Sequence, residues 1–169
     1  TQPESLMSKQ IAELELILRQ QIAEHQKMLA MVESHHAAMK KFDLRAMEDI
    51  GHREEACRLR IATLEHKRKT LTLQIAKALK LPGDLKMTQI ADLHPAQRAS
   101  LLKLRAELRS LMDQISRKNF IAAKVAGAVL GHLNTAVRLL AGAVEKAGLY
   151  TKQGVPKVSS RIGMMEAVG

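Results

Sequence analysis

Two pairs of side chains with the spacing of metal ligands stand on either side of a predicted turn. Glu33 precedes His36 by three residues, and Asp49 precedes His52 by the same interval. In a four-helix bundle, two Glu-x-x-His motifs and two further carboxylates form a dinuclear metal site. Here only three long helices are predicted, and the third offers few carboxylates. We therefore interpret these histidines as half-exposed residues near a helix end, and expect no metal and no other cofactor.

Catalytic groups are equally sparse. The single cysteine, Cys57, falls on an apolar helical stripe, so we interpret it as a core residue and not as a nucleophile. It cannot form an internal disulfide, which is consistent with a reducing compartment. Gly127 and Gly131 lie within a helical pattern and do not follow a strand, so they are not a phosphate-binding loop. We expect no catalytic residues and no enzymatic activity.

The positive charge is concentrated in one segment. The formal net charge is +10, and residues 58–86 hold eight basic and two acidic residues. Such a helix can bind phosphates, or it can be a solvated face that complements the helix dipole. A nucleic-acid partner is the less favoured interpretation, because no binding motif and no aromatic platform for bases is present. A nucleic-acid or anionic-surface binder would use Lys67, Arg68, Lys69, Lys77, Lys80 and Lys86.

The elements that would position these residues are helices. Apolar residues make up 46% of the sequence, but one Tyr, two Phe and no Trp leave a core of Leu, Ile, Val, Ala and Met. That composition, without alternating β-branched runs, is typical of helical bundles. We predict an all-α fold: an elongated antiparallel bundle of three long helices with a short connector helix, forming one domain over residues 1–150, and a flexible tail over 151–169.

Breaker and capping residues set the predicted boundaries. The first helix is expected over residues 4–41 and the second over 44–80, with Asp43 as the N-cap of the second. Pro82 and Gly83 end the second helix. Thr88 is expected to cap the short connector that reaches Leu93, and Pro95 to begin a third helix over 95–149.

The third helix carries more apolar surface than one packing partner can cover. From Ser116 to Gly154 its apolar residues recur at steps of three and four, the spacing of one helix face; they are Ile121, Val125, Val129, Leu133, Val137, Leu140 and Val144. Gly127, Gly131 and Gly142 add a face of small residues that favours mobility, close helix packing, or both. Whether the helix is continuous through these glycines stays open.

No membrane insertion is expected. The most apolar window, residues 121–144, contains Lys124, His132, Asn134 and Arg138, each of which is costly inside a bilayer. The first twenty residues mix charged and apolar side chains, unlike a secretory signal. These features predict a cytoplasmic protein.

Residues spread along the whole chain carry a resemblance to a known family. They are Phe42-Asp43-Leu44 followed by Met47 and Ile50, the connector Thr88-x-Ile90-x-x-Leu93, Asn119 after Leu111 and Ile115, Tyr150 four residues before Gly154, and the apolar end with Met164, Met165 and Ala167. In this layout the sequence resembles the FlgN-like flagellar export chaperones. It departs from them at Ser116, where the family often has Asn, and at Thr151, where an acidic residue is common.

The resemblance implies a non-enzymatic chaperone of flagellar type III secretion. Such chaperones bind the C-terminal helices of the hook-associated proteins FlgK and FlgL, keep them monomeric and deliver them to the export gate protein FlhA. Carried onto this sequence, the substrate surface would be the third helix from Asn119 to Leu149, with Val125, Val129, Leu133, Val137, Leu140 and Val144. Tyr150 would contact the gate.

Two other functions stay open. A basic nucleic-acid or anionic-surface binder predicts steep salt dependence of binding. A homo-oligomeric coiled-coil scaffold predicts that the apolar face of the third helix is permanently buried against a second copy of the chain.

Overall fold

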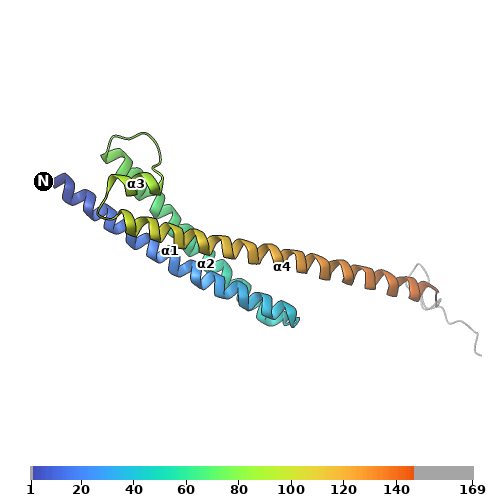
Figure 1. The fold of residues 1–169 in the computed structure, drawn as a ribbon. Coiled ribbons are helices and arrows are strands. Elements are labelled where there is room, and N and C mark those ends of the chain that lie inside the picture. The colour runs from blue at the N-terminus through green and yellow to red at the C-terminus, as the bar shows by residue number, and fades with distance from the viewer. Residues whose placement is uncertain (1, 147–169) are drawn as a thin grey trace, which may run out of the picture. The chain divides into compact units, whose positions relative to one another are not determined.

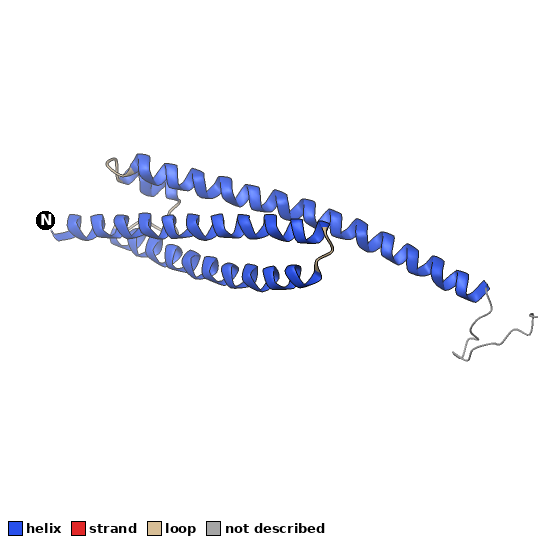
Figure 2. Ribbon diagram, turned by 90° about the horizontal axis from the view of Figure 1, so that it is seen from below, coloured by secondary structure: helices blue, strands red, loops and turns tan. Residues whose placement is uncertain are grey.

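The computed structural model describes residues 2–146, and every long element in that range is a helix. The order is α1 (Gln2–Lys40), α2 (Leu44–Ala78), α3 (Met87–Leu93) and α4 (Arg98–Lys146). Figure 2 shows helices joined by loops, with no strand among the described residues. The predicted all-α class, with three long helices and one short helix, is confirmed.

Three helix starts differ from their predictions, and the first is α1, which begins at Gln2 and not at residue 4. We expected α4 to begin at Pro95, but Pro95 belongs to a turn in which the Arg98 N–H donates to the Pro95 carbonyl at 3.4 Å, and the helix begins at Arg98. We expected Thr88 to cap α3, but the helix begins one residue earlier. There the Lys86 N–H donates to the Gln89 side-chain oxygen at 2.8 Å, which satisfies the helix entrance without Thr88.

The link between α1 and α2 is short and well capped. Asp43 is the N-cap of α2, as predicted, because its carboxylate accepts a hydrogen bond from the Ala46 N–H at 3.0 Å. Phe42 has a φ of 54°. This left-handed conformation reverses the chain at the end of α1. The two long helices therefore lie side by side (Figure 1).

Polar contacts define the direction of α2 along α1. The Gln21 side chain donates to Glu65 at 3.0 Å. Further along α1, Glu24 accepts from Arg60 at 2.9 Å, and His35 lies 3.2 Å from Glu54. Residues later in α1 contact residues earlier in α2. The helix α2 therefore runs in the opposite direction to α1.

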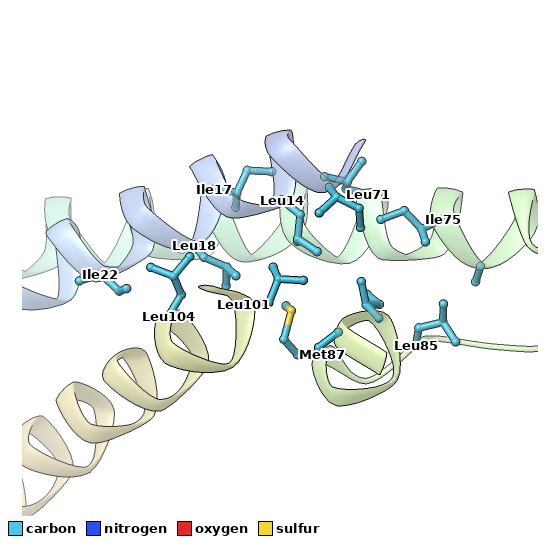
Figure 3. Packing of buried hydrophobic residues seen from close by; sticks show 14 of the residues in the cluster. Leu14, Ile17, Leu18, Ile22, Leu71, Ile75, Leu85, Met87, Leu101 and Leu104 are labelled. Carbon is cyan, nitrogen blue, oxygen red and sulfur yellow. The ribbon is translucent and has the colours of Figure 1, made fainter. Parts of the chain in front are cut away.

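All four helices contribute to the main core. Figure 3 shows Leu14, Leu18, Ile75, Met87 and Leu101 within it. A smaller cluster lies toward the end of α1 and the start of α2 and contains Met28, Met31, Val32 and Cys57. Cys57 is fully buried, which confirms its interpretation as a core residue.

Compactness divides the chain into two units. The first, Thr1–Ala122, contains α1, α2, α3, the start of α4 and both core clusters. The second begins at Ala123, and its described part is the remainder of α4.

Candidate functional site

One apolar stripe follows a single face of α4 along the helix. Its residues recur at steps of three and four, or multiples of a turn; they are Leu101, Leu104, Leu108, Leu111, Ile115, Ala122, Ala126, Val129, Leu133, Val137, Leu140 and Val144. In the first half, Leu101 is fully buried and Leu104 and Leu111 are also buried. We call this the buried half of the stripe.

The second half has a different environment. Leu133 is 56% exposed, Val137 62% and Leu140 66%, and Val144 is also exposed. Val129 is half-buried. We call Val129, Leu133, Val137, Leu140 and Val144 the exposed half of the stripe. Isolated exposed apolar residues are ordinary, but a continuous apolar surface on one helix marks an interaction site.

The predicted substrate residues all lie on α4, but they are divided between the two units of the chain. Val125 is exposed beside the exposed half of the stripe. Asn119 belongs to the Thr1–Ala122 unit, where it lines a shallow groove with Met28 and Ile115. Tyr150, the predicted gate contact, and Leu149 lie outside the described residues.

The helix is continuous through its glycines. α4 runs unbroken from Arg98 to Lys146, which answers the question left open by the sequence. A Cβ atom added at Gly127, Gly131 or Gly142 would meet no atom within 4 Å. Gly131 precedes Leu133 by two residues, a rotation of about 200° around the helix, so it lies on the far side from the stripe.

A comparison with protein-family models matches residues 7–157 to the FlgN protein family. This chain belongs to the FlgN family. FlgN proteins are flagellar export chaperones, so the match places the chain among chaperones that bind flagellar proteins. No curated protein and no solved structure matches the chain.

This FlgN-family chain exposes apolar residues that its predicted binding set did not contain. Leu130 and Leu139 are 65% and 70% exposed. Leu130 borders the stripe, three residues before Leu133, and Leu139 lies off it. The signal for them was the near absence of charge between residues 121 and 144, which makes the helix apolar on several sides. One window within Arg98–Glu145 is long and apolar enough to cross a membrane by length and composition, and none of it is buried.

Of the predicted metal-motif residues, Glu33 has another partner in this FlgN-family chain, and His36 Nε2 is buried without a hydrogen-bond partner among the described residues. Glu33 of α1 forms an ion pair with Lys118 of α4 at 3.0 Å. His35, not His36, contacts Glu54 on α2. Within residues 2–146 the structure brings together no group of three or more potential metal ligands.

Cys57 is held among neighbours that keep its thiol protonated. Its Sγ donates to the Glu24 carbonyl oxygen at 3.3 Å. Burial raises the pKa of the Cys57 thiol. The adjacent Glu24 carboxylate accepts hydrogen bonds from Lys27 at 2.7 Å and Arg60 at 2.9 Å, which lower its pKa to about 2.

The basic segment of α2 is partly neutralised in the FlgN-family chain. Arg68 donates two hydrogen bonds to Glu65, at 2.8 and 2.7 Å, and Lys69 lies 3.9 Å from the same carboxylate. The remaining members of the set, Lys67, Lys77, Lys80 and Lys86, are exposed and form no ion pair with a described residue.

Proposed function

We propose that this chain is a cytoplasmic chaperone that binds the C-terminal helices of the hook-associated proteins FlgK and FlgL through α4. Binding would prevent premature assembly, and a surface that includes Tyr150 would deliver the complex to the export gate protein FlhA. The observation that supports this proposal is the exposed half of the stripe, in which Val129 is half-buried and the other four apolar residues are exposed.

Helix-in-groove recognition is the mechanism that such a surface favours. An amphipathic client helix places its apolar residues at i, i+3, i+4 and i+7 against Leu133, Val137 and Leu140. Fully burying a Leu or Val side chain contributes roughly 1.5–3 kcal/mol. Ordering the client segment costs about 1–2 kcal/mol per residue. Because these terms oppose each other, the complex can be specific and still release its client.

The two units would have different roles in binding. The Thr1–Ala122 unit fixes the start of α4 through Leu101, Leu104 and Leu111, so the helix beyond it begins from an ordered turn. Starting a helix is the unfavourable step and extending one is not. The client surface would therefore be helical before the client arrives, with Asn119 as a polar contact at its beginning.

The test is a titration of the full chain with C-terminal helical peptides of FlgK and FlgL at low and high salt. We expect saturable one-to-one binding that survives high salt, and a loss of affinity of about tenfold or more in Leu133→Asp, because one buried Leu contributes that much. Leu139→Asp is the matched control: the same residue type on the same helix, 70% exposed but off the stripe.

Three results would contradict the proposal. Absence of binding to both peptides is the first. Equal weakening by the two variants is the second, because it would mean that the stripe has no special role. The third is concentration-dependent self-association that Leu133→Asp abolishes and that excludes the peptides, because it would assign this face to a homo-oligomeric scaffold.

A further inference from the structure

A second groove, separate from the exposed half of the stripe, lies within the Thr1–Ala122 unit. It has a volume of about 270 Å³ and is formed where α1, α2, α3 and α4 meet. Leu18 and Met87, both buried, form its floor. Figure 3 shows these two side chains in the core beside Leu101. The floor is therefore anchored in the most tightly packed part of the unit.

Three arginines from two helices line this groove. Arg68 comes from α2, and Arg105 and Arg109 come from α4. Arg68 is fixed in place by its two hydrogen bonds to Glu65, and only 20% of its side chain is exposed. Glu65 is the only carboxylate in the lining, and Arg68 and Gln21 already donate to it.

The positive charges of the two arginines of α4 are not neutralised by a described carboxylate. Arg105 and Arg109 stand four residues apart on one helix face, exposed, and neither forms an ion pair with a described residue. Two like charges at this spacing repel each other and destabilise a helix. An acidic ligand would remove that repulsion, and each guanidinium can bind a carboxylate through two parallel hydrogen bonds.

Apolar side chains stand between these charges. Leu108 is half-buried and Met112 is 52% exposed, and both line the groove next to Arg105 and Arg109. Met is flexible and polarisable, so it adapts to varied apolar partners. A basic rim around an apolar strip complements an amphipathic helix that has acidic residues beside its apolar face. No aromatic side chain lines the groove, so it lacks the stacking surface that single-stranded nucleic acid uses.

We infer that this groove, with Arg68, Arg105 and Arg109 at its rim, is a docking site for an acidic amphipathic helix of a partner protein. The site does not depend on the exposed half of the stripe, because its residues all belong to the Thr1–Ala122 unit. A chaperone with two such surfaces can hold one protein on α4 and contact another through the arginine groove.

The probe is a labelled helical peptide of about 18 residues, with Leu at i, i+3, i+7 and i+10 and Glu at flanking positions, the pattern of an amphipathic helix. A matched peptide carries Gln in place of every Glu. We expect the full chain to bind the acidic peptide at least about tenfold more tightly, because charge-assisted hydrogen bonds to carboxylates are lost with Gln. Fluorescence anisotropy measures both affinities.

The variant that tests the site is Arg105→Glu with Arg109→Glu. We expect about a tenfold or greater loss of affinity for the acidic peptide, because attraction becomes repulsion. The control is Lys103→Glu with Arg117→Glu, which changes the net charge by the same amount from exposed positions of α4 outside the groove. Arg105→Gln with Arg109→Gln gives a milder second variant, and circular dichroism verifies that each variant is folded.

Several outcomes would overturn the inference: equal affinity for the Glu and Gln peptides, equal loss in the test and control variants, or complete displacement of the peptide by a DNA oligomer. The last would assign the groove to nucleic-acid phosphates. Leu133→Asp separates this site from the proposed client surface, because we expect it to bind the acidic peptide as the unaltered chain does. If only the client titration fails, the inference about the arginine groove is unaffected.

Discussion

The two halves of α4 carry the same apolar stripe, and only one of them is covered. Leu101 in the buried half is fully inaccessible, whereas Leu133 in the exposed half, with the same side chain on the same face, is 56% exposed. Both lie in one unbroken helix. The difference is therefore not one of local sequence preference. It comes from packing: Leu101, Leu104 and Leu111 belong to a core cluster with residues of α1, α2 and α3, whereas none of the described residues from Ala123 onward belongs to a core cluster.

That contrast indicates what each half contributes. Burial of the first half supplies stability, because apolar area removed from water is the main favourable term in folding. The second half retains its apolar area for a later association. A helix that continues a core stripe beyond its core is thus an economical way to present a binding surface in a defined conformation.

The largest effect should come from truncating matched leucines in the two halves. Leu101→Ala removes a fully buried side chain, so we expect the free energy of unfolding to fall by about 2–5 kcal/mol. Leu133→Ala should change it by less than about 0.5 kcal/mol, as for other exposed substitutions. Urea denaturation followed by circular dichroism measures both values.

This pair of variants also tests whether the exposed half is free in solution. If Leu133→Ala destabilised the chain as much as Leu101→Ala does, the exposed half would have to be buried, most simply against a second copy. Repeating the denaturation over a range of protein concentrations would identify that case, because the stability of a dimer rises with concentration.

A smaller effect should follow from weakening the helix pair beneath the buried half. Glu24 of α1 accepts hydrogen bonds from Arg60 of α2 and from Lys27, so we expect Glu24→Gln to lower the free energy of unfolding by about 1 kcal/mol at neutral pH. Glu13→Gln is the control, because Glu13 is an exposed carboxylate on the same helix that forms no ion pair with a described residue.

The same residue gives the expected pH dependence. The pKa of Glu24 is lowered from 4.5 to about 2 by its hydrogen bonds to Lys27 and Arg60. Its stabilising contribution is present in full above pH 4.5 and is lost as the pH falls through about 2. Acid denaturation of the unaltered chain should be steeper in this window than that of Glu24→Gln. Identical acid profiles would show that Glu24 does not stabilise the helix pair.

Much of this architecture could be predicted because it depends on local sequence patterns. The long helices follow from apolar spacing, and the Asp43 cap follows from a residue type with a strong positional preference. The α4 stripe was visible for the same reason. Its exposure was inferred from apolar surface in excess of the available partners, and the side-chain accessibilities agree with that inference.

Other features could not be predicted because they depend on contacts between distant residues or on competing local bonds. The groove joins Arg68 to Arg105 and Arg109, which are far apart in the sequence and meet only through tertiary packing. The start of α3 was misplaced because the Gln89 side chain satisfies the Lys86 N–H, an alternative to a Thr88 cap. The partner of Glu33 was likewise an unforeseen lysine on another helix.

The smallest expected effect concerns the glycine side of the exposed half. Gly131→Ala should stabilise the surrounding helix by about 0.5–1 kcal/mol, because alanine loses less backbone freedom and its Cβ would meet no atom within 4 Å. Slower hydrogen exchange in residues 123–146 would measure this. Gly51→Ala is the control: its Cβ is also unobstructed, but it lies in α2, so it should leave exchange in residues 123–146 unchanged.

Binding data on the same variant determine which side of α4 a client uses. Gly131 faces away from the stripe, so client peptides should bind Gly131→Ala with unchanged affinity or slightly more tightly, since the helix is better ordered beforehand. A tenfold loss would mean that the partner helix packs against the glycines, where an added methyl group holds two backbones apart. In that case Leu133→Asp should have little effect, and the two variants together decide between the two faces.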